Sequence, residues 1–206
     1  MLDLLSFFRD IAGLPYCAVK MSPTFPRYKE GEDVDIFCYS VNDIAARVIS
    51  WGKRYAAQGY SIKVSNVHKG QHVHVDVCRE GALHFRFDLY EALPAYQKLM
   101  VKPALFESVV ENAVSTFFQM ADEQVEVKVP APIDDLLIRY LEFAEWYDVR
   151  PDKIKHLDFI MGSSDAQARE KMLQKLHHYT KLPPLFIPHE CPFCRFTARL
   201  KKYLPG

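Results

Sequence analysis

One short stretch, Gly31 to Phe37, constrains the fold more than any other part of the chain. It reads Gly-Glu-Asp-Val-Asp-Ile-Phe, with acidic and apolar residues in alternation. Successive side chains of a strand point to opposite faces, so Val34 and Ile36 are predicted to enter a core while Asp33 and Asp35 share the other face. Two carboxylates about 6 to 7 Å apart along one face repel each other, so a cation, an arginine or open water must compensate them. The pair favours a magnesium site.

Composition predicts a folded protein without a strong overall charge. The chain has 206 residues, 49% of them hydrophobic, which suffices for a sizeable core. Its 26 basic and 26 acidic side chains give zero net charge, so we expect neither nucleic acid nor an anionic membrane as a partner. Met1 to Ala12 is interrupted by Asp3, Arg9 and Asp10, which is not typical of a signal peptide or membrane span. A cytoplasmic location is therefore expected.

The cysteines do not predict a disulfide framework. The chain has five cysteines: Cys17, Cys38, Cys78, Cys191 and Cys194. This number is odd, and the first three lie in apolar, strand-like runs where buried thiols are common. The last two form a Cys-Pro-Phe-Cys motif that follows His189, with His177 and His178 further upstream. A zinc site and partly exposed thiols are both compatible with this spacing.

The acidic strand is flanked by predicted helices. An apolar stripe predicts a helix over Leu2 to Ile11, and Tyr16 to Lys20 reads as a strand. After the acidic strand, Ser40 begins a helix with a capping pattern, and Gly59 ends it.

Three alternating stretches then predict an antiparallel meander. They are Tyr60 to Val67, Gln71 to Cys78 and Leu83 to Leu89, separated by short turns that contain glycine. The second and third stretches each carry a polar face that can converge with the other: His72, His74 and Asp76 on the second; His84, Arg86 and Asp88 on the third.

In the second half of the chain, the spacing of apolar residues becomes typical of helices. Helices are predicted over 105–121, 134–146 and 165–179, with a strand or hairpin arm over 124–129 between the first two. We therefore predict an α+β fold with two regions, a core over residues 1–93 and a mostly helical region over residues 94–206.

This order of elements resembles the polymerase-beta-like nucleotidyltransferase superfamily. The resemblance rests on a strand, a short connection, a strand bearing Asp-x-Asp, a helix and a later strand bearing a third aspartate. It implies a mixed β-sheet with flanking helices, in which Asp33 and Asp35 are catalytic and bind two divalent ions, Mg²⁺ or Mn²⁺. The third carboxylate matches Asp76 best, and Asp88 is its rival.

In the resembled family, a Gly-Ser pair begins the loop that holds the triphosphate. Here Met21-Ser22 stands in its place, and Ser22 lies eleven residues before Asp33. A side chain where the family has glycine limits the approach of backbone N–H groups to phosphate. The resemblance therefore implies nucleotide binding through side chains of this loop, namely Lys20, Ser22, Arg27 and Lys29.

The implied activity is metal-dependent transfer of a nucleotidyl group from a nucleoside triphosphate to a small hydroxyl or phosphate acceptor. A weaker resemblance to nucleotidyltransferase-like proteins of bacterial surface-polysaccharide gene clusters implies a sugar or sugar phosphate as that acceptor. The sequence indicates neither the base nor the oligomeric state.

Three other interpretations remain open. The altered Met21-Ser22 turn is compatible with an inactive binding protein of the same fold. A glycosyltransferase also uses Asp-x-Asp, but its usual nucleotide-binding unit of roughly 100 residues does not fit into the 32 residues before Asp33. Finally, His72, His74 and Asp76 share one strand face and offer ligands that suit a transition metal.

Overall fold

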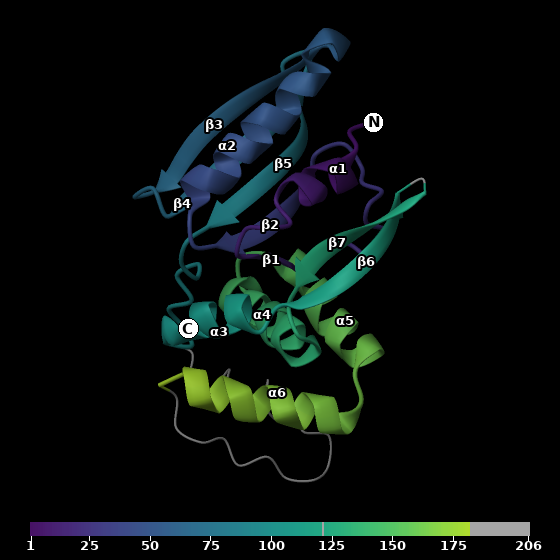
Figure 1. Cartoon of the computed structure of the whole chain (residues 1–206). Helices are drawn as coiled ribbons and strands as arrows, with labels where there is room; N and C mark the ends of the chain where they lie inside the picture. The colour runs from purple at the N-terminus through teal and green to yellow at the C-terminus, as the bar shows by residue number, and fades with distance from the viewer. Residues whose placement is uncertain (121, 182–206) are drawn as a thin grey trace. The chain divides into compact units, whose positions relative to one another are not determined.

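The computed structural model describes residues 1–120 and 122–181, which form two compact units. The first unit consists of residues 1–94 and 106–131, and the second of residues 95–105 and the described residues from 132 onward. Figure 1 shows strands and helices in the first unit and packed helices in the second. The predicted α+β class is confirmed.

A mixed five-stranded sheet forms the centre of the first unit. In spatial order its strands are β1 (Tyr16–Val19), β2 (Glu32–Cys38), β5 (Ala82–Tyr90), β4 (His72–Arg79) and β3 (Tyr60–His68). Strands β2 and β5 are parallel, while the other neighbours are antiparallel. The predicted meander is confirmed, and the parallel pair joins it to the acidic strand.

Two helices of the first unit begin at side-chain caps. Asp3 accepts a hydrogen bond from the backbone of Ser6 at the start of α1 (Leu4–Asp10), and Ser40 does the same for Asp43 in α2 (Val41–Gly52). A 3-10 turn, η1 (Lys53–Gln58), follows α2. It ends at Gly59, whose φ of 82° is the left-handed conformation that glycine adopts without a steric penalty.

One face of the sheet is buried beneath α1 and α2. Phe87 of β5 is fully buried there, with its ring 4.6 Å from Phe7 of α1 and 5.5 Å from Trp51 of α2. The indole of Trp51 also donates a hydrogen bond to the hydroxyl of Ser6 at 2.9 Å. Because neighbouring residues of a strand alternate, this packing leaves the opposite face of the sheet to polar side chains.

The prediction of one helix over 105–121 is wrong. Helix α3 (Ala104–Glu111) ends first, and β6 (Val114–Met120) follows it as one arm of a hairpin with β7 (Glu123–Val129). The apolar spacing that begins in α3 continues locally, but residues 114–120 are rich in β-branched and aromatic residues. These residues pair with β7, the strand that was predicted, and therefore form a strand instead of a helix.

The second unit is a helical cluster around α4 (Pro132–Trp146). This helix packs against α5 (Ile154–Ser163) and α6 (Ala166–Tyr179), and a short 3-10 turn, η2 (Pro151–Lys153), precedes α5. Helices α4 and α6 were predicted, whereas α5 was not. Inside the cluster, the ammonium of Lys153 lies 2.6 Å from a carboxylate oxygen of Glu142, and the hydroxyl of Tyr96 donates to the other oxygen at 2.9 Å.

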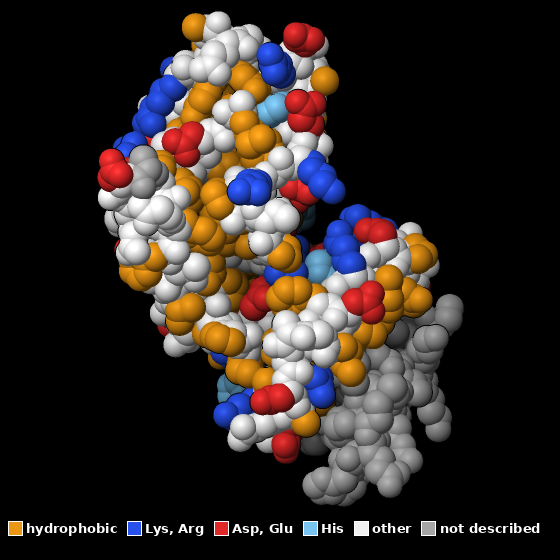
Figure 2. Space-filling model, turned by 90° about the vertical axis from the view of Figure 1, so that its right-hand side faces the viewer, with side chains coloured by type: hydrophobic (Ala, Val, Ile, Leu, Met, Phe, Trp, Pro, Cys, Tyr) orange, Lys and Arg blue, Asp and Glu red, His pale blue; other side chains and the backbone are white. Residues whose placement is uncertain are grey.

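The surface mixes charges of both signs. On the face drawn in Figure 2, blue basic and red acidic side chains are interspersed among the described residues, in keeping with the zero net charge. Among residues 1–120 and 122–181, no helix combines the length and apolar character needed to cross a membrane.

Replacing Phe87 with alanine tests the buried face of the sheet. Phe87→Ala is expected to lower the free energy of unfolding by about 3–5 kcal/mol, because it leaves a cavity between α1, α2 and the sheet. The matched control is Phe117→Ala, since Phe117 is 58% exposed on β6 and should change stability by less than about 0.5 kcal/mol. Urea unfolding followed by circular dichroism measures both values, and equal losses in the two variants would contradict the packing.

Candidate functional site

Strand β2 presents its two aspartates on the polar face of the sheet. Val34 and Ile36 are 5% and 0% exposed in the core, as predicted, while Asp33 is exposed and Asp35 is partly exposed. The alternation of the strand therefore places the side chains that pack in the core on one face and those of the candidate site on the other.

The parallel pairing of β2 with β5 brings a third carboxylate beside this pair. Asp35 is the register partner of Asp88, and Asp33 is the register partner of Arg86. Neighbouring strands lie about 4.8 Å apart, and register partners point to the same face. Asp33, Asp35 and Asp88 therefore lie on the same face of two adjacent strands.

Asp76 lies one strand further from Asp33, on β4. Its register partner is Arg86, which donates hydrogen bonds of 2.7 and 3.1 Å to the two oxygens of Asp76. These hydrogen bonds are the main reason that the pKa of Arg86 is raised. Arg86 stands between Asp76 and Asp33, whereas Asp88 lies directly beside Asp35 on the neighbouring strand.

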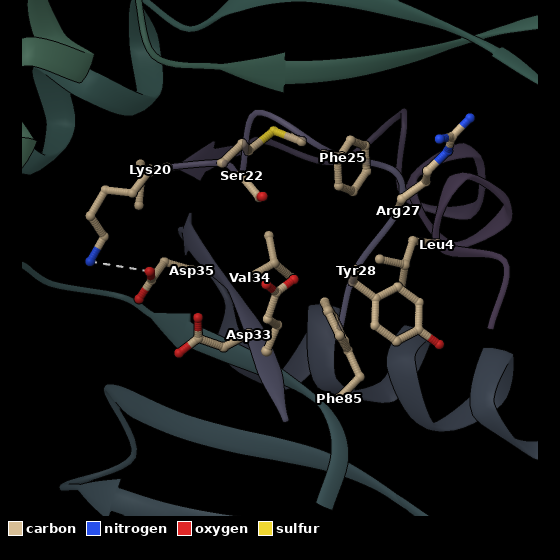
Figure 3. Close-up of a pocket in the computed structure, with 13 residues that line it drawn as sticks. Leu4, Lys20, Ser22, Phe25, Arg27, Tyr28, Asp33, Val34, Asp35 and Phe85 are labelled. Atoms are coloured by element: carbon tan, nitrogen blue, oxygen red, sulfur yellow. Dashed lines mark ion pairs between the residues drawn. The ribbon is translucent and has the colours of Figure 1, made fainter. Parts of the chain in front are cut away.

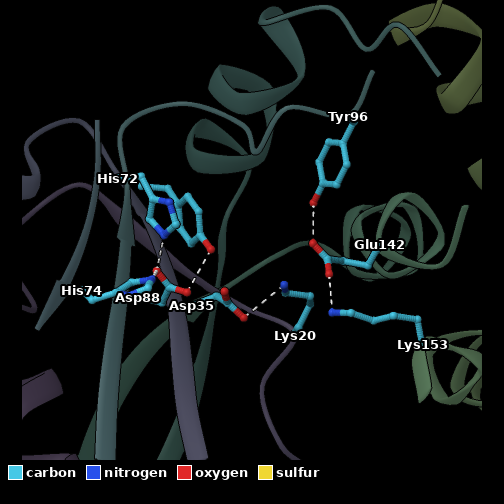
Figure 4. Close-up of polar contacts among 9 residues, drawn as sticks. Lys20, Asp35, His72, His74, Asp88, Tyr96, Glu142 and Lys153 are labelled. Atoms are coloured by element: carbon cyan, nitrogen blue, oxygen red, sulfur yellow. Dashed lines mark hydrogen bonds and ion pairs between the residues drawn. The ribbon is translucent and has the colours of Figure 1, made fainter. Parts of the chain in front are cut away.

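Asp88 is buried, and Figure 4 shows His72 and His74 beside its carboxylate. Its Oδ1 atom lies 2.5 Å from Nε2 of His72 and 3.2 Å from Nε2 of His74, and its Oδ2 atom accepts a hydrogen bond of 3.0 Å from Tyr90. Burial lowers the pKa of His74, although the charge of Asp88 acts in the opposite direction. The predicted convergence of polar faces thus joins the two histidines to Asp88 rather than to Asp76.

The negative charge of Asp35 is balanced by Lys20, which follows β1, the other neighbour of β2. The ammonium of Lys20 lies 3.1 Å from the carboxylate of Asp35, and both side chains are largely buried. Lys20 follows β1 directly and has a φ of 54°, the left-handed conformation that is uncommon for residues other than glycine. The chain turns away from β2 at this residue.

A pocket lies where β1 ends and the following loop covers β2. It is open to solvent, and Lys20, Ser22 and Arg27 contribute to its lining. Figure 3 shows Lys20 directed toward Asp35 on one side of this pocket. The other side is largely apolar and is formed by Leu4, Phe25, Tyr28, Val34 and Phe85.

Not every predicted residue joins this pocket. Lys29 is exposed and is not part of the lining, although its backbone N–H donates to the carboxylate of Glu32 at 3.0 Å. The Cys191-Pro-Phe-Cys194 motif and His189 lie outside the described residues. Cys17 and Cys38 are buried and Cys78 is partly buried, and burial raises the pKa of Cys38 to about 12.

Sequence reasoning did not assign Tyr90 or the aromatic side of the pocket. Tyr90 continues the alternation of polar residues that includes Arg86 and Asp88, and this pattern could have indicated that it shares their face of the sheet. Phe25 and Tyr28 come from a proline-rich loop without periodicity, so no pattern indicated that they line a pocket.

No protein-family model matches the sequence, and no curated protein is similar to it. The chain is similar to the crystal structure of an antigenic nucleotidyltransferase-like protein from Paracoccidioides brasiliensis, with 13% sequence identity and a TM-score of 0.42 over 100% of this chain and 92% of that chain.

The different surroundings of Asp33 and Asp76 predict different effects on stability. Asp76→Asn should lower the free energy of unfolding by about 1–3 kcal/mol, because Arg86 loses a charged acceptor on a partly buried face. Asp33→Asn should change it by less than about 0.5 kcal/mol, because Asp33 is exposed. Urea unfolding measures both, and a larger loss for Asp33→Asn would show that the roles are reversed.

Proposed function

We propose that the chain transfers a nucleotidyl group from a nucleoside triphosphate to a small hydroxyl or phosphate acceptor, and that Asp33, Asp35 and Asp88 hold the divalent ions. The observation that carries the proposal is the parallel register of β2 and β5, which aligns Asp35 with Asp88. It supports the three-carboxylate arrangement that the Asp-x-Asp resemblance implies.

The donor set fits Mg²⁺ or Mn²⁺. Carboxylate oxygens are the ligands that these ions prefer in proteins, and Asp33 contributes to the pocket lining. When bound, such ions neutralise charge on the phosphates and lower the pKa of an attacking hydroxyl. In the chain itself, three carboxylates within two strands provide the negative charge that a cation needs.

Other pocket residues fit the parts of a nucleotide. Lys20 and Arg27 offer positive charge for the phosphates, Ser22 offers a hydroxyl, and Lys29 is proposed to approach from outside the lining. The apolar side, with three aromatic rings, offers a surface for a base or sugar: Phe25, Tyr28 and Phe85. A sugar or sugar phosphate remains the proposed acceptor.

The same geometry supports one second candidate, a binding protein without catalysis. Lys20 already compensates Asp35, and His72, His74 and Tyr90 already contact Asp88. Such a protein would bind nucleoside triphosphates equally well with and without Mg²⁺ in calorimetry. A Mg²⁺-dependent affinity accompanied by pyrophosphate release distinguishes the enzyme.

Removal of single carboxylate charges tests the proposed reaction. Asp33→Asn, Asp35→Asn and Asp88→Asn should each reduce pyrophosphate release from nucleoside triphosphates by at least about 100-fold, because each removes a ligand. The assay uses four nucleoside triphosphates with Mg²⁺ or Mn²⁺, with and without sugar phosphates. Asp122→Asn is the control, since Asp122 is exposed in the turn of the hairpin and should retain full activity. Full turnover in Asp33→Asn and Asp35→Asn would refute the assignment.

The ion pair between Lys20 and Asp35 leads to a separate prediction about the affinity for Mn²⁺. Lys20→Met should tighten Mn²⁺ binding in the absence of nucleotide by about 10-fold, because Asp35 then loses the ammonium that lies 3.1 Å from its carboxylate. The same variant should weaken nucleotide binding, since a phosphate-binding charge is lost. Titration calorimetry measures both effects, and unchanged Mn²⁺ affinity would exclude Lys20 as the counter-ion that a metal displaces.

A further inference from the structure

We propose that His72, His74 and Asp88 form a second type of metal site, which binds a borderline divalent cation such as Zn²⁺ or Co²⁺. This inference goes beyond nucleotidyl transfer, because it concerns nitrogen ligands that the three-carboxylate site does not use. It holds whether or not the chain is an enzyme.

The geometry comes from two neighbouring strands. His72 and His74 alternate on β4, and His74 is the register partner of Asp88 on β5. One ligand atom from each of these three residues lies within 4.8 Å of the other two. Three donors of the two-histidine, one-carboxylate type thus converge on the polar face of the sheet and leave further coordination positions open.

The distances are close to those of a bound ion. In a tetrahedral zinc site with bonds of about 2.0–2.1 Å, neighbouring ligand atoms lie about 3.3 Å apart. His74 Nε2 lies 3.2 Å from Asp88 Oδ1, which already fits, and the 2.5 Å between His72 Nε2 and the same oxygen must widen by less than 1 Å.

Contacts around the ligands hold them in place. The ring of Tyr90 stacks on His72 at a centroid distance of 4.2 Å and an interplanar angle of 15°, and its hydroxyl donates to Asp88 Oδ2 at 3.0 Å. His72 and His74 also contact each other edge to face at 4.9 Å. Outer contacts of this kind orient ligands before an ion arrives, and Tyr90 leaves Oδ1 of Asp88 directed toward the histidines.

Ligand chemistry separates this site from the one proposed for Mg²⁺. Imidazole nitrogens suit Zn²⁺, Co²⁺ and Ni²⁺, whereas Mg²⁺ takes oxygen ligands. Asp88 belongs to both sets, but Asp33 and Asp35 belong only to the carboxylate set. Variants at the histidines therefore leave all three aspartates intact, and variants at Asp33 leave the histidine site intact.

The test is calorimetric titration of the chelator-treated full chain with Co²⁺ and with Zn²⁺. The double variant His72→Gln, His74→Gln keeps amide donors near Asp88 and should lose one bound ion, or bind it more than 100-fold more weakly. Tyr90→Phe tests the positioning role and should weaken that ion by about 10-fold. Ions bound elsewhere, including any at Cys191 and Cys194, remain in every variant.

Two controls and a direct spectrum complete the experiment. Asp122→Asn removes an exposed carboxylate from the turn between β6 and β7 and should leave the affinities of the histidine site for both ions unchanged, as should Asp33→Asn. In the wild-type chain, Zn²⁺ should shift the imidazole ¹⁵N signals of His72 and His74, a readout that needs no variant. Equal ion counts and affinities in the wild type and the double glutamine variant, or unshifted signals of both imidazoles, would overturn the proposal. Urea unfolding midpoints verify that each variant is folded, and pyrophosphate release, assayed separately, reports only on nucleotidyl transfer.

Discussion

The parallel pairing of β2 with β5 is the constraint on which the candidate site depends. It aligns Asp35 with Asp88, two residues that are 53 positions apart in the chain, and it continues the same register through Ile36 and Leu89 in the core. A slip of one residue would turn every side chain of β2 to the opposite face. Burying Asp33 and Asp35 while exposing Val34 and Ile36 is costly, so the hydrophobic core fixes the register of the polar face.

That register also creates an electrostatic problem. Two carboxylates about 5 Å apart repel each other by roughly 3 kcal/mol at an effective dielectric constant of about 20. Within the described residues, Lys20 compensates Asp35, and the donors around Asp88 include Tyr90 and two histidines. An exposed ion pair contributes only about 0–1 kcal/mol, so several partly buried contacts are needed. These contacts explain how such a surplus of negative charge is tolerated, and a cation is a further way to balance it.

Much of the fold follows from local patterns. Alternation located β2 and the meander, and the caps at Ser40 and Gly59 bounded the helical stretch after β2. Strand order is different, because it depends on contacts between residues far apart in the sequence. Asp76 and Asp88 both occupy polar positions of the meander, and only the pairing of β5 with β2 distinguishes them. The helix predicted over 105–121 failed for the same reason, since β7 pairs with residues 114–120.

The short length of β1 accounts for the position of the pocket. Strand β1 pairs only with residues 35–38 of β2, so the edge of residues 32–34 is left to the loop that follows β1. The left-handed turn that begins this loop falls on Lys20, one residue before Met21. A glycine at Met21 is therefore not needed for the turn itself. A non-glycine residue in this conformation costs about 1–2 kcal/mol, and the ion pair of Lys20 with Asp35 offsets part of that cost. Glycine would adopt this conformation more easily, but Lys20 supplies a positive charge at the mouth of the pocket, where phosphate groups are proposed to bind.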